Sequence, residues 1–315
     1  MLIYSLVYCI FPNIFYGLYI LHNHTKAQPK EEIMSKNPKV SVLTPIYNTN
    51  SAHLQEMIES ILNQTFKDFE FLILNDSPDN KEIENIVKSY KDRRIKYSRN
   101  DKNMGITPSR NKLLKMARGE YIAVFDHDDI SVPTRLEQEV AYLDANPNVG
   151  VVSGFIQDFG DKSAVRIVPE FDTDIKIALT DWCCIWHTAA MVRKSVLIDN
   201  GIEYEEFYSP CEDYRLWSRL MSVTNFYNLQ TVLVKYRTFE NQTSNKQKSR
   251  MDMMHRAVQL DIINRFPAYW NMWRDSDACT TRFRFRLFGI IPIFKVKHNW
   301  VLLFDFIPLF KIRWR

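Results

Sequence analysis

The chain has 315 residues, of which 46% are hydrophobic and 25% are charged, so it can bury the core of one large domain or two small ones. The formal net charge of +4 is unevenly placed, because residues 280–315 hold eight Lys or Arg against one acidic residue, Asp305. The rest of the chain holds 33 basic and 36 acidic residues, a balance that argues against a nucleic-acid-binding protein.

Cysteine usage favours a reduced, cytoplasmic compartment, because the five cysteines are odd in number and lack paired metal-type spacing. They are Cys9, Cys183, Cys184, Cys211 and Cys279. In such a compartment the N-x-T triplets that start at Asn23, Asn63 and Asn241 are expected to stay unmodified.

Residues 1–37 form an apolar N-terminal extension. Residues 1–21 carry no charged side chain and are long enough for a single transmembrane segment, although Pro12, Asn13 and Gly17 interrupt the run. The alternative is a cytosolic chain that starts at Met34, directly before the first predicted strand. The sequence leaves both interpretations open.

From residue 38 onward, β-branched runs alternate with helical patterns. The first half predicts strands at 39–48, 69–76, 94–100 and 120–126, and helices at 54–62, 80–90, 107–117 and 133–143. The second half is less regular, with strands predicted at 149–156, 183–193 and 226–237, and helices at 211–221 and 252–266. Strands that alternate with helices indicate parallel pairing in an open, doubly wound α/β sheet.

Polar residues follow the carboxyl ends of the first four predicted strands, where ligands bind on sheets of this kind. No G-x-G-x-x-G follows the first strand and no G-x-x-x-x-G-K-[ST] occurs in the sequence, so the usual glycine-rich phosphate loops are missing. With eight glycines in the chain, we expect a cation rather than backbone amides to bind phosphate.

The most acidic of these strand ends lies in the sequence AVFDHDDISVP, residues 123–133. Asp126, Asp128 and Asp129 would repel one another unless a positive group lies there, and a metal, an arginine or only water are the candidates. Residues two apart on an extended segment share a face, so Asp126 and Asp128 can converge on one Mg²⁺ or Mn²⁺ ion. A cluster that caps the following helix is the alternative.

Five segments, in this order and at this spacing, resemble glycosyltransferase family 2, the inverting nucleotide-sugar enzymes of the GT-A fold. They are VSVLTPIYN, ILNQTFKDFEFLILNDSP, NMGITPSRN, GEYIAVFDHDDISVPTRLE and CEDYRLW. The resemblance covers residues 38–245 and implies a Rossmann-like open mixed sheet with helices on both faces. Beyond this domain we expect a helix within 246–279 and a basic, apolar tail at 280–315.

The resemblance also implies a nucleotide-sugar site at the strand ends. The nucleobase pocket would be formed by Pro45, Tyr47, Asn48, Asp76, Asn103 and Gly105. Asp76 would hydrogen-bond the base, typically uracil, and Arg110 would lie near the ribose and diphosphate. Asp126 would lie nearer the ribose, and Asp128 would be the direct ligand of Mn²⁺ or Mg²⁺, which stabilises the departing phosphate.

The segment CEDYRLW matches the family motif that carries the general base. By the resemblance, Asp213 would take the proton of the acceptor hydroxyl and Glu212 would position the acceptor. The alternative is that both acids only favour the N-terminus of a helix. Trp217, one turn later, can stack on a sugar face or belong to the core.

The sequence YRTF departs from the family pattern. Members often have a histidine two residues after the arginine, here Arg237, but this chain has Phe239. A third metal ligand from that position is therefore in doubt. His187 in IWHTAA is a substitute, although a lone histidine in an apolar run is more often a core residue.

The tail contains a near-repeat, because LFGIIPIFKVK from Leu287 recurs as LFDFIPLFKIR from Leu303. Apolar, aromatic segments that end in basic residues suit an anionic membrane surface. Similar tails occur on bacterial enzymes that build lipopolysaccharide or capsule. The alternative is a pair of short strands or turns packed on the body.

Together these features predict a metal-dependent, inverting hexosyl- or N-acetylhexosaminyltransferase of surface-polysaccharide or lipopolysaccharide biosynthesis. Its donor would be a UDP-linked sugar, and its acceptor the hydroxyl of a glycan or glycolipid at the cytoplasmic face of the membrane. One alternative is a non-catalytic, nucleotide-sugar-binding or scaffold protein of the same fold. A nucleotidyltransferase would need a Gly- and Lys-rich loop after the first strand, and TPIYNTNSA is not one.

Overall fold

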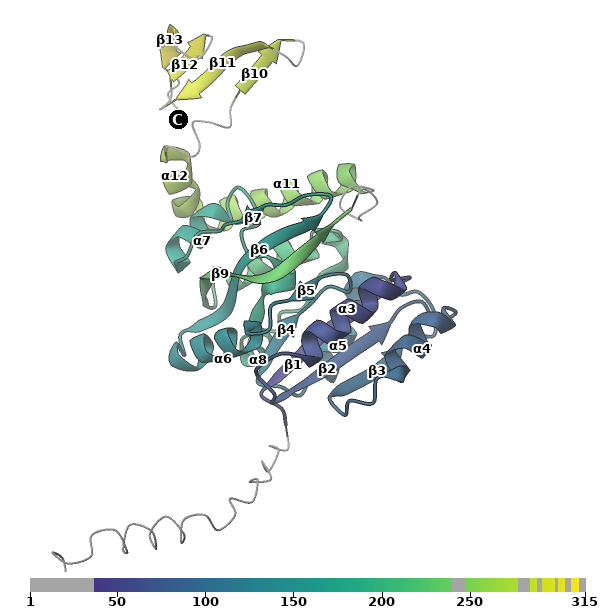
Figure 1. Ribbon diagram of the computed structural model, residues 1–315. Helices are drawn as coiled ribbons and strands as arrows, with labels where there is room; N and C mark the ends of the chain where they lie inside the picture. Colours follow the sequence, from purple (N-terminus) through teal and green to yellow (C-terminus); the bar gives the residue numbers. More distant parts are fainter. Residues whose placement is uncertain are drawn as a thin grey trace, which may run out of the picture. The chain divides into compact units, whose positions relative to one another are not determined.

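The computed structural model describes residues 37–239 and 247–276, together with the backbone of four strands between 284 and 311 (Figure 1). The apolar N-terminal extension predicted at 1–37 falls almost entirely outside the described residues. Among those that are described, no helix is both long enough and apolar enough to cross a membrane.

In the first half of the chain, strands and helices alternate as the sequence predicts. Its strands are β1 (Val40–Ile46), β2 (Phe69–Asn75), β3 (Ile95–Arg99) and β4 (Tyr121–Val124). Its helices are α3 (Ser51–Leu62), α4 (Lys81–Ser89), α5 (Ile106–Met116) and α6 (Arg135–Ala145). Side-chain caps fix two of the starts, because Asn50 accepts from the amides of residues 52 and 53, and Asn80 accepts from that of residue 83.

The second half adds shorter elements. Its strands are β5 (Ile130–Ser131), β6 (Val149–Gly160), β7 (Val165–Arg166), β8 (Met191–Arg193) and β9 (Asn225–Thr238). Its α-helices are α7 (Asp172–Ala178), α8 (Lys194–Asp199), α9 (Glu212–Leu220), α11 (Lys248–Arg265) and α12 (Pro267–Asp275). Two 3₁₀ turns, η1 (His187–Ala189) and η2 (Glu206–Tyr208), connect them.

The strand predicted at 183–193 is wrong over most of its length. Only β8 at its end is a strand, and η1 precedes it. Within η1, His187 and Thr188 are buried and hydrogen-bond to Tyr204 and Asp129. These tertiary contacts outweigh the β-propensity of the segment.

One sheet carries the body, with its strands in the order β3-β2-β1-β4-β8-β6-β9-β5 and with β7 beside β6. β1 pairs in parallel with β2 and β4, as does β2 with β3. β8 runs antiparallel to β4 and β6, so the sheet is mixed. This is the open mixed sheet of the predicted GT-A fold.

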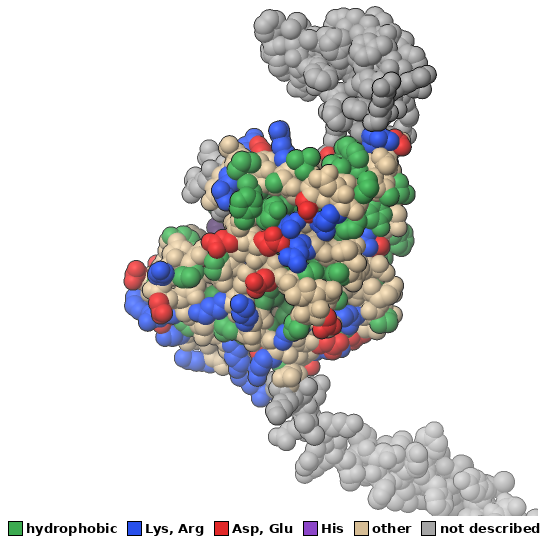
Figure 2. All heavy atoms as spheres, turned by 180° about the vertical axis from the view of Figure 1, so that it is seen from behind, with side chains coloured by type: hydrophobic (Ala, Val, Ile, Leu, Met, Phe, Trp, Pro, Cys, Tyr) green, Lys and Arg blue, Asp and Glu red, His purple; other side chains and the backbone are tan. Residues whose placement is uncertain are grey.

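Alternate residues of the central strands enter two separate cores, as the two-residue period of a strand requires. One core contains Val42, Phe71 and Ala123 with buried side chains of α3, α4 and α6. The other contains Leu43, Leu72 and Val124 with side chains of α5, α9 and α11. Helices therefore cover both faces of the sheet (Figure 1). On the surface of the body, Figure 2 shows basic and acidic side chains interspersed.

The C-terminal tail contains an antiparallel sheet of four strands. They are β10 (Arg284–Leu287), β11 (Ile291–Lys297), β12 (Trp300–Leu303) and β13 (Ile307–Lys311). The near-repeat forms two hairpins of equal register, because Leu287 pairs with Ile291 as Leu303 pairs with Ile307, sixteen residues later. The strands that the sequence offered as the alternative to a membrane-surface segment are thus present in the backbone, as four strands rather than two.

Candidate active site

The carboxylate of Asp76, at the end of β2, organises the loop that leads into α5. Its Oδ1 accepts from Asn100 Nδ2 at 2.7 Å and from the amide of Met104 at 2.8 Å. Its Oδ2 accepts from the amide of Gly105 at 2.8 Å. Asp76 is 3% exposed, so these three hydrogen bonds satisfy a buried carboxylate. They also hold the loop after β3 against the end of β2.

The other residues predicted for the nucleobase pocket surround this loop. Asn103 Oδ1 accepts from the amide of Gly105 at 2.9 Å, and Gly105 has a φ of 88° where α5 begins. The amide of Asn48 donates to Ser77 Oγ at 3.1 Å, while Tyr47 is 49% exposed. Pro45 is buried within β1. The first three strand ends therefore meet at one edge of the sheet, and the Tyr47 ring remains open there.

Arg110 is the positive group beside the aspartate cluster. Its Nη2 donates to Asp126 Oδ1 at 3.1 Å, and its Nη1 donates to Glu212 Oε1. The guanidinium also lies over the Tyr204 ring, 5.6 Å from the centroid. Of a metal, an arginine and water, the structure pairs Asp126 with an arginine. One residue of α5 thereby joins the end of β4 to the start of α9.

Asp129, the third aspartate of the cluster, has hydrogen-bond partners that could not be predicted from the sequence. It is fully buried, and its Oδ2 accepts from Thr188 Oγ1 at 2.7 Å while its Oδ1 accepts from the amide of Arg237 at 2.9 Å. Arg237 Nε also donates to the backbone oxygen of Asp128 at 2.7 Å. The arginine of YRTF therefore anchors the aspartate segment to β9.

Asp128, unlike Asp126, forms no salt bridge with another described residue. Burial raises the pKa of its carboxyl, His127 opposes the rise, and the Asp126 charge adds to it. A divalent cation at this point would relieve the same cost, so the donor set fits a hard metal ion. Within the described residues, however, no group of three His, Cys, Asp or Glu side chains is arranged to hold a metal ion, and Asp126 contacts Arg110.

His187 lies near the same oxygen of Asp126 that Arg110 contacts. Its Nε2 is 2.9 Å from the hydroxyl of Tyr204, and its Nδ1 is 3.9 Å from Asp126 Oδ1. Burial and the Arg110 charge lower the pKa of His187 to about 3, so the ring is neutral. Its buried Nδ1 has no hydrogen-bond partner among the described residues. His127, by contrast, is tied through Nδ1 to Thr49 Oγ1 at 3.1 Å.

Asp213 and Asp126 line one cavity of about 650 Å³. Burial, and then the charge of Glu212, raise the pKa of Asp213 to about 6, with Arg110 opposing them. A carboxylate that titrates there is suited to take a proton near neutral pH. Glu212 is itself buried and engaged with Arg110, so it contacts the site through that arginine.

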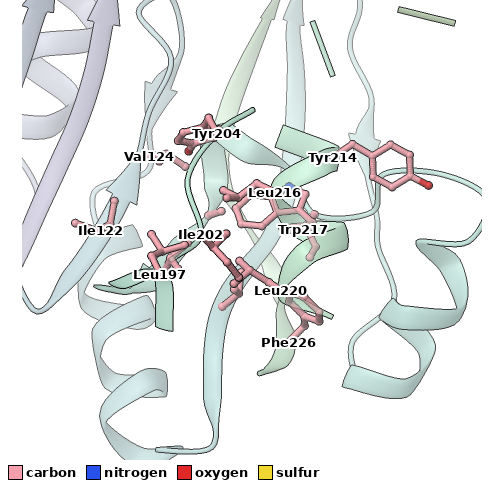
Figure 3. Close-up of a cluster of buried hydrophobic side chains, with 14 of the residues drawn as sticks. Ile122, Val124, Leu197, Ile202, Tyr204, Tyr214, Leu216, Trp217, Leu220 and Phe226 are labelled. Atoms are coloured by element: carbon pink, nitrogen blue, oxygen red, sulfur yellow. The ribbon is translucent and has the colours of Figure 1, made fainter. Parts of the chain in front are cut away.

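Trp217 belongs to the core, the alternative to a sugar-stacking role. Its side chain is 0% exposed, and Figure 3 shows it packed among Leu216, Leu220 and Tyr204. The Trp217 ring packs against the His187 ring, with their centroids 6.1 Å apart. Three further side chains that the sequence did not single out line the cavity: Arg166, Trp186 and Tyr236. Trp186 and Tyr236 lie beside His187 and Arg237 in the quoted segments, whereas Arg166 lies in no motif.

Comparison with known proteins identifies relatives of the chain. The sequence profile described as Glycosyl transferase family 2 matches residues 41–201. An uncharacterised glycosyltransferase of Methanocaldococcus jannaschii is 37% identical over 211 residues, which is 64% of this chain and 71% of the relative. The putative glycosyltransferase EpsE of Bacillus subtilis is 36% identical over 65% of this chain and 74% of its own length.

Two solved structures share the fold at low identity. S. aureus TarS 1–349, solved in complex with UDP-GlcNAc, has a TM-score of 0.59 and 21% identity over 72% of this chain and 67% of its own. The mannosyltransferase PcManGT of Pyrobaculum calidifontis, solved with GDP-Man and Mn²⁺, has a TM-score of 0.57 and 14% identity. The match covers 82% of this chain and 76% of PcManGT.

Proposed function

The chain belongs to glycosyltransferase family 2, and we propose that it is a metal-dependent, inverting enzyme that transfers a sugar from a UDP-linked donor to an acceptor hydroxyl. The transferred group would be a hexosyl or N-acetylhexosaminyl unit. TarS, a fold neighbour, was solved with UDP-GlcNAc and with UDP, which supports the choice of donor.

The observation that carries the proposal is the shared cavity of Asp126 and Asp213. Asp126 follows β4 at the sheet edge where nucleotides bind on α/β folds, and Asp213 opens α9. A donor held at the strand ends and an acceptor in the cavity would then meet between the two carboxylates.

In the proposed reaction, Asp213 acts as the general base. Its carboxylate accepts the proton of the acceptor hydroxyl as the hydroxyl oxygen attacks the anomeric carbon, and the bond to the diphosphate breaks. Attack from the face opposite the leaving group inverts the configuration. Glu212 fixes the Arg110 guanidinium, and Arg110 in turn orients Asp126 and offers positive charge to the diphosphate.

Asp128, with Asp126 beside it, would hold Mn²⁺ or Mg²⁺ together with the diphosphate. The ion would supply charge stabilisation for the departing phosphate. His187 Nδ1, buried and unpaired among the described residues, is a further candidate ligand. Mn²⁺ is present in the structure of PcManGT.

The nucleotide would lie over the loop that Asp76 organises, against the exposed ring of Tyr47. Pro45, Asn48, Asn103 and Gly105 complete the proposed pocket. Asp76 already accepts three intrachain hydrogen bonds, so we expect its contact with the base to use a remaining lone pair.

We further propose a glycan or glycolipid acceptor, used in surface-polysaccharide or lipopolysaccharide synthesis at the cytoplasmic face of the membrane. The basic, apolar composition of residues 280–315 supports membrane-surface contact. These assignments rest on composition and family resemblance.

Replacement of the metal-binding aspartate tests the proposal. Asp128→Asn removes one charge at constant size, so we expect sugar transfer to be abolished and UDP-dependent binding of Mn²⁺, measured by calorimetry, to be lost. Asp101→Asn, at an exposed residue of the loop after β3, is the control and should change neither. Near-normal turnover of Asp128→Asn, or full activity in excess EDTA, would contradict a metal-dependent enzyme. Absence of turnover from the unaltered chain would favour the scaffold alternative.

A further inference from the structure

The cavity that contains Asp126 and Asp213 has a second wall, built by Arg166, Trp186 and Tyr236. These side chains come from β7, from the residue before η1 and from β9, so three separate segments place them together. The reaction proposed above uses none of them.

Arg166 is held rigidly in this wall. Its Nε donates to Asp158 Oδ2 at 3.0 Å and its Nη2 lies 2.8 Å from Asp158 Oδ1, and Asp158 is 4% exposed. The guanidinium carbon lies 5.0 Å from the centroid of the Tyr236 ring and 5.6 Å from that of Trp186. One hydrogen bond, one ion-pair contact and two aromatic contacts therefore preorganise a planar polar group between aromatic rings.

The same wall offers a ligand an aromatic face and a hydroxyl donor. Trp186 Nε1 is itself buried and has no partner among the described residues, so Trp186 presents its ring rather than its N–H to the cavity. Burial raises the pKa of the Tyr236 hydroxyl, so the phenol keeps its proton and can donate it in a hydrogen bond. An oxygen-rich ligand would satisfy this hydroxyl.

The charges of the wall balance one another. Arg166 is paired with Asp158, and Lys162 is accompanied by Asp161 in the same lining. The remaining charged residues of the lining, Asp126 and Asp213, are acidic. An anionic ligand would therefore find no net positive charge here, whereas a neutral sugar ring can place its C–H face on an aromatic ring and a hydroxyl against that of Tyr236.

We propose that Arg166, Trp186 and Tyr236 form the subsite for the acceptor sugar, and that this sugar is neutral and rich in hydroxyls. The residues proposed for the nucleotide, such as Tyr47, Asp76 and Gly105, are not among the described residues of the lining, which places the wall on the acceptor side. This inference rests on the proposed function and specifies its substrate class.

Direct binding of simple glycosides tests the subsite. The full chain, saturated with UDP and Mn²⁺, is titrated with methyl glucoside, methyl galactoside and methyl N-acetylglucosaminide, and with methyl glucuronide as the anionic probe, under ligand-observed NMR. We expect a neutral glycoside to bind more tightly than the glucuronide. Trp186→Ala should weaken that binding about tenfold, as expected for loss of an aromatic contact. The affinity for UDP should change by less than about twofold.

Two further variants make the test specific. Trp270→Ala, at a half-buried tryptophan of α12 that stacks on Trp273, is the matched control and should bind glycosides normally. Trp186→Phe keeps an aromatic ring, although a smaller one without the N–H, so it should show a smaller loss and remains informative if Trp186→Ala unfolds.

Three results would overturn the proposal: tighter binding of the glucuronide, unchanged glycoside binding by both Trp186 variants, or a loss confined to UDP affinity. Failure of the proposed function looks different, because the unaltered chain would then release no UDP from any donor while its Trp186-dependent glycoside binding persisted.

Discussion

Arg110 shows what the sequence predicts at the scale of single residues and what it does not. The motif order placed Arg110, Asp126 and Glu212 in one site, and the structure brings all three together. The sequence motifs could not decide whether a metal ion or an arginine contacts Asp126. That choice depends on the rotamer of Arg110, which comes from a different element, α5. The same limit explains why the buried partners of Asp129 were not foreseen.

Asp213→Asn tests the general base. The substitution keeps the size of the side chain but removes its ability to accept a proton, so we expect the turnover rate to fall by about two to four orders of magnitude. Donor affinity, measured by calorimetry with UDP, should change little. A loss that appeared only in donor affinity would make Asp213 a binding residue.

The pH dependence of catalysis provides a second test of Asp213. Burial and Glu212 raise its pKa to about 6, and a base acts only when deprotonated. We therefore expect kcat/KM to rise with pH up to about 6 and to level off above it. The residual activity of Asp213→Asn should lack this step. A profile in which activity instead falls as pH rises through 6 would contradict the assignment.

At the scale of elements, periodicity predicted long strands and helices well, and short ones poorly. The helix predicted at 80–90 is α4, and the strand predicted at 226–237 lies within β9. β5 and β7 have two residues each, too few to show a period, and they form because β9 and β6 offer them partners. Arg166 was not singled out for this reason, since it belongs to β7.

The loop between β3 and α5 is an element whose stability can be tested through Asp76. Asp76→Ala removes the acceptor for Asn100 Nδ2 and for the amides of Met104 and Gly105. The Gly105 amide and Asn100 Nδ2 keep second acceptors in Asn103 and Ser109, so the Met104 amide is the donor that loses its partner. An unpaired donor costs about 1–3 kcal/mol, so the free energy of unfolding should fall by about 1–2 kcal/mol in urea titration. The exposed Asp101→Ala should stay within about 0.5 kcal/mol of the parent. Equal stability of the two variants would show that the loop is held by other contacts.

At the scale of the whole molecule, the chain combines a slightly acidic body with a strongly basic tail. The fold class followed from the alternation of strands and helices, and from the family resemblance of residues 38–245. The tail repeat was visible in the sequence, and the structure adds that both copies form hairpins of one register. The binding partner of the tail could not be predicted in the same way, because the periodicity of a sequence reports its strands and helices and not what their surfaces contact.

Vesicle binding tests the role proposed for the tail. A chain that starts at Met34 should bind vesicles of anionic lipid, and added salt should weaken the binding, because each basic residue near the surface contributes about 1 kcal/mol. Removal of residues 280–315 should release the protein from the vesicles. Equal binding to neutral and anionic vesicles would contradict the electrostatic account. A truncated protein that is insoluble would indicate that the tail completes the core.

The most direct test of the central claim, that this chain catalyses sugar transfer, is nucleotide release from a panel of UDP-, GDP- and dTDP-sugars in the presence of Mn²⁺. The account predicts that at least one UDP-sugar yields UDP above the buffer rate, that the GDP- and dTDP-sugars react more slowly, and that EDTA abolishes the release. Binding of UDP without release of nucleotide from any donor would contradict it and identify a non-catalytic member of the family.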